Sequence, residues 1–286
     1  GRTHDRAEAA RLRLIDRVGK DVFDALRLDL NNPKSVMAAS EEFAARGTKV
    51  YRLILNAGMV SGSELVRTDE GIEVTTASSL IGHHQLTMQL LEDNMLCAHA
   101  RIVIAGSEAA RGDVPTFNPT PLPEFAAEHY GNDRAEAVEA LMRHDVPLKY
   151  SPATAYANAK LFVAYWAQQL ARKLPTGMTV NTVSPGSAPD TDAGRNANFF
   201  MKYVLVPVFK LVPGMSHTIA DGAKRYLDAA AYPEQVTGEF FASPPKKVVG
   251  AIEKVTVAHV KDSESAAAAW DAVVKVAGGV DYPVAA

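Results

Sequence analysis

The chain has 286 residues, of which 47% are hydrophobic and 22% are charged, a composition typical of soluble globular proteins. Its 30 Lys and Arg residues nearly balance 33 Asp and Glu residues, and because these charges are interspersed we expect neither nucleic acid nor an anionic membrane surface as a partner. A single cysteine, Cys97, excludes an internal disulfide and favours a cytoplasmic location, and no apolar run reaches the roughly 18 residues that a membrane span needs.

In chain order, the apolar positions alternate between helical spacing and short β-rich runs. We expect helices over 6–18, 32–46, 69–95, 133–143, 153–173, 198–212, 217–231 and 263–276, and strands over 22–28, 50–55, 101–105, 179–183 and 238–241. This alternation predicts an α/β fold in which a doubly wound parallel sheet carries helices on both faces. The long connection over 111–152 is rich in Pro and charge, and loops of this length are commonly functional.

The strongest chemical motif is a tyrosine followed four residues later by a lysine, Tyr156 and Lys160. On a helix this spacing places both side chains on one face. A phenol has an ordinary pKa near 10, so it serves as an acid or base at neutral pH only where its anion is stabilised, and a nearby ammonium does this. The same pair also occurs on ordinary amphipathic helices, so its meaning depends on the surrounding motifs.

Four further motifs accompany this pair in a fixed order. They are Asp29-Leu30, Asn56-Ala57-Gly58, Gly106-Ser107 after an apolar run, and Ser184-Pro185-Gly186. With them, residues 1 to about 243 resemble the short-chain dehydrogenase/reductase family, in particular its retinol-dehydrogenase-like and carbonyl-reductase-like members. The resemblance implies a Rossmann-type sheet with a nicotinamide dinucleotide across the carboxyl ends of the strands, and hydride transfer between a carbonyl and an alcohol.

The family pattern also implies a role for each catalytic side chain. Tyr156 would be the general acid or base, and Lys160 would lower the phenol pKa and bind the ribose hydroxyls. Ser107 would orient the substrate oxygen, although its ordinary role is that of a turn residue. Ser79 stands where the family has an Asn that holds a water linking the lysine to solvent, and a hydroxyl can hold that water with shorter reach.

Cofactor binding is implied for eleven residues: Arg2, Asp29, Leu30, Asn56, Ala57, Gly58, Tyr156, Lys160, Pro185, Gly186 and Thr191. Asp29 would accept from the adenine amino group, and Thr191 would bond the carboxamide. Arg2 occupies a position where a basic residue favours the 2′-phosphate, so the resemblance implies a preference for NADP(H), with NAD(H) possible. We expect no metal site, because the adjacent His83 and His84 diverge on a helix.

The glycine-rich turn that cradles the pyrophosphate in this family is absent from the sequence. We expect that an upstream segment with the first strand and this turn is omitted, and that Gly1-Arg2 is the tail of the second strand. No repeat or linker marks a boundary, so we expect a single domain over 1–286. It would consist of a core over 1–243 without the first βαβ part and a C-terminal extension over 244–286.

Two apolar features favour a lipophilic carbonyl or alcohol as the substrate: the segment over 199–209, and the aromatic side chains of the long loop, which we expect to form the opposite wall. Packing in the core or in a dimer contact is the alternative use of the apolar segment. Those loop residues are Phe117, Phe125, His129 and Tyr130. Family members usually pair through the helices of the Ser79 and Tyr156 motifs, which implies a homodimer or homotetramer. The alternative function is a catalytically impaired, dehydrogenase-like binding or regulatory protein, which Ser79 and the absent turn would favour.

Overall fold

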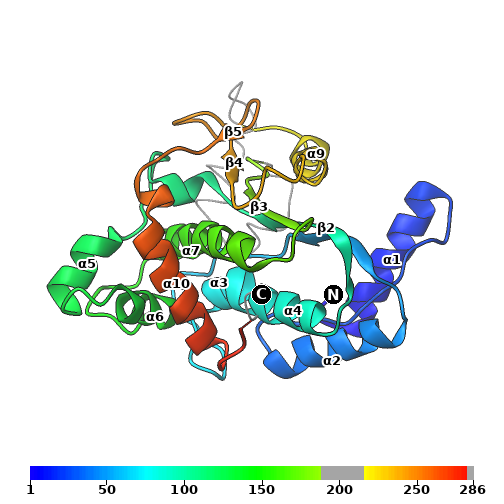
Figure 1. Cartoon of the computed structure of the whole chain (residues 1–286), viewed down its shortest axis with the longest axis horizontal. Helices are drawn as coiled ribbons and strands as arrows, with labels where there is room; N and C mark the ends of the chain where they lie inside the picture. The colour runs from blue at the N-terminus through cyan, green and yellow to red at the C-terminus, as the bar shows by residue number, and fades with distance from the viewer. Residues whose placement is uncertain (188–215, 282–286) are drawn as a thin grey trace.

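The computed structural model describes residues 1–187 and 216–281, and its centre is a five-stranded sheet (Figure 1). The strands lie in the order β1 (Val50–Leu55), β2 (Leu96–Ala105), β3 (Thr179–Val183), β4 (Phe240–Ala242) and β5 (Glu253–Lys254). All neighbours from β1 to β4 are parallel, and β5 is antiparallel to β4. The predicted α/β fold with a mostly parallel sheet is confirmed.

Helices connect these strands and carry most of the remaining chain. They are α1 (His4–Val18), α2 (Pro33–Ala45), α3 (Val74–Thr76), α4 (Gly82–Glu92), α5 (Leu122–His129), α6 (Arg134–Arg143), α7 (Pro152–Lys173), α9 (Ile219–Ala229) and α10 (Ser263–Val276). A π-helical segment, η1 (Ala77–Ile81), joins α3 to α4, and η2 (Glu108–Arg111) is a 3-10 turn. The sequence pattern did not predict α5, and the helix expected over 198–212 lies outside the described residues.

Side chains of β2 alternate between two cores, one on each face of the sheet. Ile102 and Ile104 belong to the core that α7 covers, whereas Val103 and Ala105 belong to a smaller core with Tyr226 of α9. This period of two is what a pleated strand dictates. The sheet therefore has helices on both faces.

Helix α7 is buried around its whole circumference over residues 157–167. It packs on β2 and β3, and α6 and α10 cover it from the other side (Figure 1). Trp166 of α7 donates a hydrogen bond of 3.0 Å to Nδ1 of His84, whose Nε2 donates to the Val280 carbonyl. Burial lowers the pKa of His84 to about 4, so the ring is neutral and makes both bonds. The residues after 244 thus contribute to the main core.

The predicted strand over 22–28 was wrong, since residues 20–29 have no strand structure. Among the described residues, Gly1 alone makes backbone hydrogen bonds to residues 22–28: its nitrogen donates to the Leu26 carbonyl at 2.9 Å, and its carbonyl accepts from Leu28 at 2.8 Å. A strand requires hydrogen-bonded neighbours along its length, and one residue does not supply them. Within the described parts of the chain, β1 pairs only with β2.

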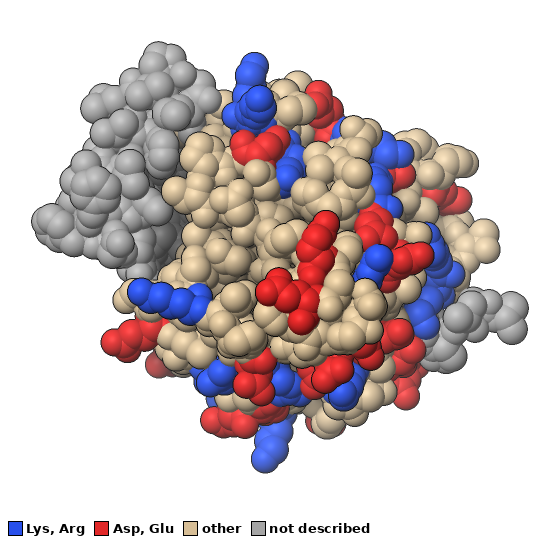
Figure 2. All heavy atoms as spheres, turned by 90° about the vertical axis from the view of Figure 1, so that its left-hand side faces the viewer, with Lys and Arg blue, Asp and Glu red and all other residues tan. Residues whose placement is uncertain are grey.

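Across residues 1–187 and 216–281, no helix combines the length and apolar character that crossing a bilayer requires. On the face of the molecule drawn in Figure 2, acidic and basic side chains are interspersed. That mixture agrees with the charge pattern along the sequence.

One glycine permits the turn before α2 to approach α4. A Cβ on Gly82 would lie 2.7 Å from Cβ of Leu30 and closer still to the Leu30 carbonyl. We therefore expect Gly82→Ala to lower the free energy of unfolding by about 1–3 kcal/mol, the usual range for overpacking. Urea denaturation followed by circular dichroism measures this.

Gly62→Ala is the matched control, because a Cβ there meets nothing within 4 Å. We expect it to change the free energy of unfolding by less than about 0.5 kcal/mol. Equal stability of the two variants would contradict the close approach of Leu30 to α4.

Candidate active site

The carboxyl ends of β1, β2 and β3 lie at one edge of the sheet, because the three strands are parallel. Asn56 follows β1, Ser107 follows β2 after Gly106, and Pro185 follows β3 after Ser184. Helix α7 runs beside this edge, and Lys160 Nζ donates a hydrogen bond of 2.7 Å to the Ala105 carbonyl at the end of β2. The fold thus brings the separate sequence motifs together.

Tyr156 is half-buried, and its phenol lies close to the Ser107 side chain. Burial raises the pKa of the phenol above its ordinary value, the nearby Ser107 hydroxyl lowers it, and the negative charge of Glu108 raises it. Lys160 is not among these causes, although its Nζ lies 5.7 Å from the Tyr156 ring centroid. The resemblance implied a lowered phenol pKa, whereas the structure gives the opposite direction.

Lys160 is 3% exposed, and burial lowers the pKa of its amine to about 8. Ser79 lies close by on the π-helical segment, is 1% exposed and has an Oγ without a hydrogen-bond partner among the described residues. A Cβ on Gly58 would lie 3.1 Å from Ser79 Oγ and 3.3 Å from Lys160 Nζ. The absence of a Cβ on Gly58 therefore lets the turn after β1 approach both groups closely. π-Bulges are frequent at functional sites, which fits this position.

His83 holds the turn that carries Gly58. Its Nε2 donates a hydrogen bond of 2.9 Å to the Ala57 carbonyl, and burial lowers the pKa of the ring to about 4. The sequence suggested only a packing or cofactor-wall role for this histidine. Its neighbour His84 faces Trp166, so the two rings diverge as expected for adjacent helical residues.

Steric crowding accounts for two glycines at the strand ends. A Cβ on Gly106, where the family usually has a serine, would lie 2.6 Å from Thr182 and 2.8 Å from Phe240. Gly186 has a φ of +72°, and a Cβ there would lie 2.7 Å from Arg225 Nη1. Larger side chains are thus excluded at both turns.

The residues assigned to the adenosine end lie near the chain start. Gly1 pairs with the chain at 26–28, which places Arg2, an exposed residue, beside the segment leading to Asp29. The Asp29 carboxylate accepts from the Asn31 backbone at 3.1 Å, and Leu30 packs on Gly82 of α4. Asn56, Ala57 and Gly58 are exposed, and Thr191 lies outside the described residues.

The four aromatic residues expected in one wall separate into two groups. The Phe117 ring meets the Tyr156 ring edge-on at a centroid distance of 5.7 Å. In contrast, Phe125 lies in the α7-side core and stacks with His129 and Tyr130 around α5. Only Phe117 stands beside the phenol.

Asn158 fixes the loop that carries Phe117. Its Oδ1 accepts from the Thr120 backbone at 2.7 Å, and its Nδ2 donates to the Thr120 hydroxyl at 3.0 Å. Sequence reasoning missed this residue, together with Glu108, Arg225 and Tyr226, which lie close to the site. The signal was weak: Glu108 directly follows Ser107, but nothing in the pattern indicates that it is buried.

The buried amine of Lys160 makes stability depend on pH. The pKa of Lys160 is about 8 in the folded chain, against an ordinary value of 10.5. Burial of the charged amine therefore lowers the free energy of unfolding by its full amount below pH 8, and this loss of stability disappears as the pH rises toward 10.5. We expect Lys160→Met to gain free energy of unfolding relative to the original chain at pH 7. This gain should be about 3 kcal/mol larger at pH 7 than at pH 10.5.

Denaturation midpoints of both chains across this range measure the difference. Lys20→Met, at an exposed position after α1, is the matched control and should give a difference that does not change with pH. A pH-independent difference for Lys160→Met would show that the amine is not buried as described.

Comparison with known proteins gives relatives of one kind. WW domain-containing oxidoreductase of Drosophila melanogaster is 32% identical over 174 residues, which are 60% of this chain and 37% of that protein. Retinol dehydrogenase 13 of Mus musculus is 27% identical over 259 residues, which are 89% of this chain and 68% of that protein. The chain spans only 37% to 53% of the first two WW domain-containing oxidoreductases that it matches. No protein-family model matches the chain.

Solved structures share the fold at lower identity. Salutaridine reductase from Papaver somniferum has a TM-score of 0.58 and 20% identity, over 84% of this chain and 88% of that chain. An uncharacterized protein from Mycobacterium paratuberculosis has a TM-score of 0.65 and 21% identity, over 99% of this chain and 83% of that chain. Given these relatives and the ordered motifs gathered at one sheet edge, the chain belongs to the short-chain dehydrogenase/reductase family.

Proposed function

We propose that the chain carries a nicotinamide-dependent oxidoreductase activity that interconverts a carbonyl and an alcohol. The observation that carries this proposal is the position of the Tyr156 phenol beside the Ser107 side chain, one helical turn from the buried amine of Lys160. These three groups come from β2 and α7, which rigidly packed cores hold in place. Preorganised donors of this kind suit a developing oxyanion.

Each side chain has a role that its environment supports. The raised pKa of Tyr156 keeps the phenol protonated near neutral pH, which suits proton donation to a carbonyl oxygen. The Ser107 hydroxyl, within hydrogen-bonding reach of that phenol, orients the same oxygen. In the reverse direction, Tyr156 must first lose its own proton, and its phenolate then receives the proton of the alcohol. A bound nicotinamide supplies or accepts the hydride.

The nicotinamide half of the cofactor fits the residues at the sheet edge. Gly58 brings the exposed turn after β1 close to Lys160 Nζ and to the unpartnered Ser79 Oγ, both of which are buried groups that can hydrogen-bond ribose or water. Pro185 and Gly186 form the turn beneath the ring. Asn56 and Ala57 line the exposed strand end beside it. Thr191 stays assigned to the carboxamide by resemblance.

At the other end of the cofactor, Asp29 and Leu30 stay assigned to the adenine pocket. NADP(H) is the proposed preference, with NAD(H) possible, because Arg2 lies beside the segment that leads to Asp29. A guanidinium is well suited to a phosphate group, since it presents several donors in a fixed plane.

A lipophilic carbonyl or alcohol is the proposed substrate class. Phe117 presents an apolar ring beside Tyr156, and its loop is held by two hydrogen bonds to Asn158. The names of two relatives, retinol dehydrogenases 12 and 13, are those of enzymes for a lipophilic alcohol. The apolar segment over 199–209 lies outside the described residues and stays a prediction.

A homodimer or homotetramer, if formed, would use a surface other than residues 157–167 of α7. Residues 157–167 of that helix are buried within one chain, because α6 and α10 cover the side that faces away from the sheet. The pairing implied by the family resemblance would require the side of α7 that faces away from the sheet to be exposed. We therefore propose a different contact, and sedimentation analysis of the chain measures the assembly.

Removal of the phenol hydroxyl tests the enzymatic function. We expect Tyr156→Phe to bind NADPH as tightly as the original chain does, which nicotinamide fluorescence measures. Its rate of carbonyl reduction should fall about 10²–10⁴-fold. The assay uses a panel of aldehydes and ketones graded in apolar size, in which the larger apolar members should be the better substrates.

Tyr51→Phe, at an exposed position on β1, is the matched control and should keep full activity. Binding without turnover by the original chain would favour the alternative, a catalytically impaired binding or regulatory protein. Unchanged turnover in Tyr156→Phe would remove the phenol from the mechanism, and no dinucleotide binding at all would overturn the proposed function.

The cofactor preference is tested by comparing NADPH with NADH. We expect Arg2→Ala to weaken NADPH binding about tenfold and to leave NADH binding unchanged, since only NADPH has the extra phosphate. Arg13→Ala, an exposed arginine of α1, should change neither affinity. Equal loss for both dinucleotides would show that Arg2 does not discriminate between them.

A further inference from the structure

Glu108 is a buried carboxylate directly beside the candidate catalytic serine. It is the first residue of η2, follows Ser107 in the chain and is only 4% exposed. A charged group removed from water needs hydrogen bonds and an opposite charge to offset its lost hydration. The mechanism proposed above gives this side chain no role.

The Glu108 carboxylate joins the ends of two strands to the Ser107 turn. Its Oε2 accepts a hydrogen bond of 2.5 Å from the hydroxyl of Ser184, which follows β3. Its Oε1 accepts a hydrogen bond of 3.0 Å from the backbone of Ser243, which follows β4. One side chain therefore links the ends of β2, β3 and β4.

The hydrogen bond to Ser184 also sets the turn that follows it. Because the Ser184 hydroxyl gives its proton to Glu108, its oxygen is left as an acceptor, and it accepts from the Gly186 backbone at 3.0 Å. Glu108, Ser184 and Gly186 thus form one continuous chain of hydrogen bonds. It runs from the residue after Ser107 to the turn assigned to the nicotinamide.

Arg225 of α9 supplies the opposite charge and closes the arrangement. Its Nη1 lies 3.8 Å from Glu108 Oε1 and donates to the Ser184 carbonyl at 3.1 Å. Its Nη2 donates to the Gly250 carbonyl at 2.7 Å and to the Ser243 hydroxyl at 3.2 Å. Since both partners are buried, the loss of either one would leave an uncompensated charge.

We propose that Glu108 is a positioning residue for the reaction: through Ser184, it holds the Pro185-Gly186 turn at a fixed place relative to Ser107. The proposal rests on the proposed function. The turn beneath the nicotinamide and the hydroxyl that orients the substrate oxygen come from different strands. The buried carboxylate between them keeps the substrate-orienting hydroxyl and the turn beneath the nicotinamide at a fixed distance from each other.

The charge of Glu108 has a second effect, on the phenol. It raises the pKa of Tyr156, after burial and against the effect of the nearby Ser107 hydroxyl. The carboxylate therefore favours the protonated phenol, which is the form that reduces a carbonyl. A residue with only a structural role would not move the pH profile in this way.

The test separates the charge of Glu108 from its hydrogen bonds. In Glu108→Gln, we expect kcat for carbonyl reduction to fall about tenfold and the alkaline limb of its pH profile to move to lower pH, because a nearby negative charge is removed. Glu108→Asp keeps the charge but is one methylene shorter, so kcat should fall while the alkaline limb keeps its position.

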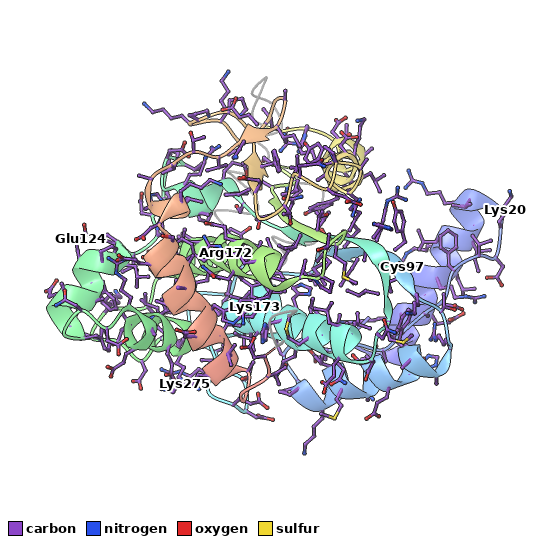
Figure 3. The ribbon with its side chains drawn as sticks, in the orientation of Figure 1. Lys20, Cys97, Glu124, Arg172, Lys173 and Lys275 are labelled. Atoms are coloured by element: carbon purple, nitrogen blue, oxygen red, sulfur yellow. The ribbon has the colours of Figure 1, made fainter. Side chains whose placement is uncertain are left out.

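Hydrogen exchange gives a readout that does not depend on cofactor or turnover. Amides over 184–187 should exchange faster in Glu108→Gln and in Ser184→Ala, which removes only the hydroxyl link. Glu124→Gln, an exposed glutamate on α5 at the edge of the view in Figure 3, is the matched control and should change none of these measurements.

The outcomes distinguish this proposal from the proposed function. If the original chain binds dinucleotide and reduces carbonyls, but Glu108→Gln keeps its kcat, pH profile and exchange rates, the positioning role is wrong. If the original chain shows no binding or turnover, the proposed function is wrong, and the exchange rates alone test the link from Glu108 to Gly186. Should Glu108→Gln not fold, Ser184→Ala carries the same test, with faster exchange and lower kcat expected.

Discussion

The packing of α7 across the carboxyl end of β2 is the constraint on which the rest of the site depends. The buried amine of Lys160 donates a hydrogen bond to the carbonyl of Ala105, the last residue of β2. This bond fixes the position of α7 relative to β2. Ser107 follows two residues later and reaches Tyr156, one turn before Lys160. The catalytic pair and the serine are therefore placed by packing that continues into the largest core.

Buried ionisable groups on both sides of this contact give the site its electrostatic character. Among the described residues, Lys160 has a single hydrogen-bond partner, the Ala105 carbonyl, and burial of this weakly compensated amine lowers its pKa to about 8. Glu108 has two hydrogen-bond donors and a nearby guanidinium, so its charge is well compensated. Such groups cost stability, which the rest of the fold must offset. Buried ionisable groups with shifted pKa values cluster at functional sites, so their position beside Tyr156 agrees with a functional site there.

Local sequence patterns predicted most helices and strands. They failed where the structure of a segment depends on hydrogen bonds to a distant part of the chain. Helices with strong starts agree closely: Asn32 and Ser151 each cap a helix whose first residue is proline, as the sequence pattern requires. The strand over 22–28 did not form, because a strand needs a neighbouring backbone and, among the described residues, Gly1 alone makes backbone hydrogen bonds to that segment. The aromatic wall failed for a similar reason, since Phe125 belongs to a core that nonlocal contacts define.

The sequence by itself determined the family, the parallel α/β fold and the set of motifs around Tyr156, because periodicity, turn residues and short motifs are local properties of the chain. Only the tertiary structure decided which groups share one environment. The pKa direction of Tyr156, the hold of His83 on Ala57 and the burial of Glu108 against Arg225 arise between residues far apart in the chain. Burial and electrostatic coupling depend on distance in space, which sequence spacing does not specify.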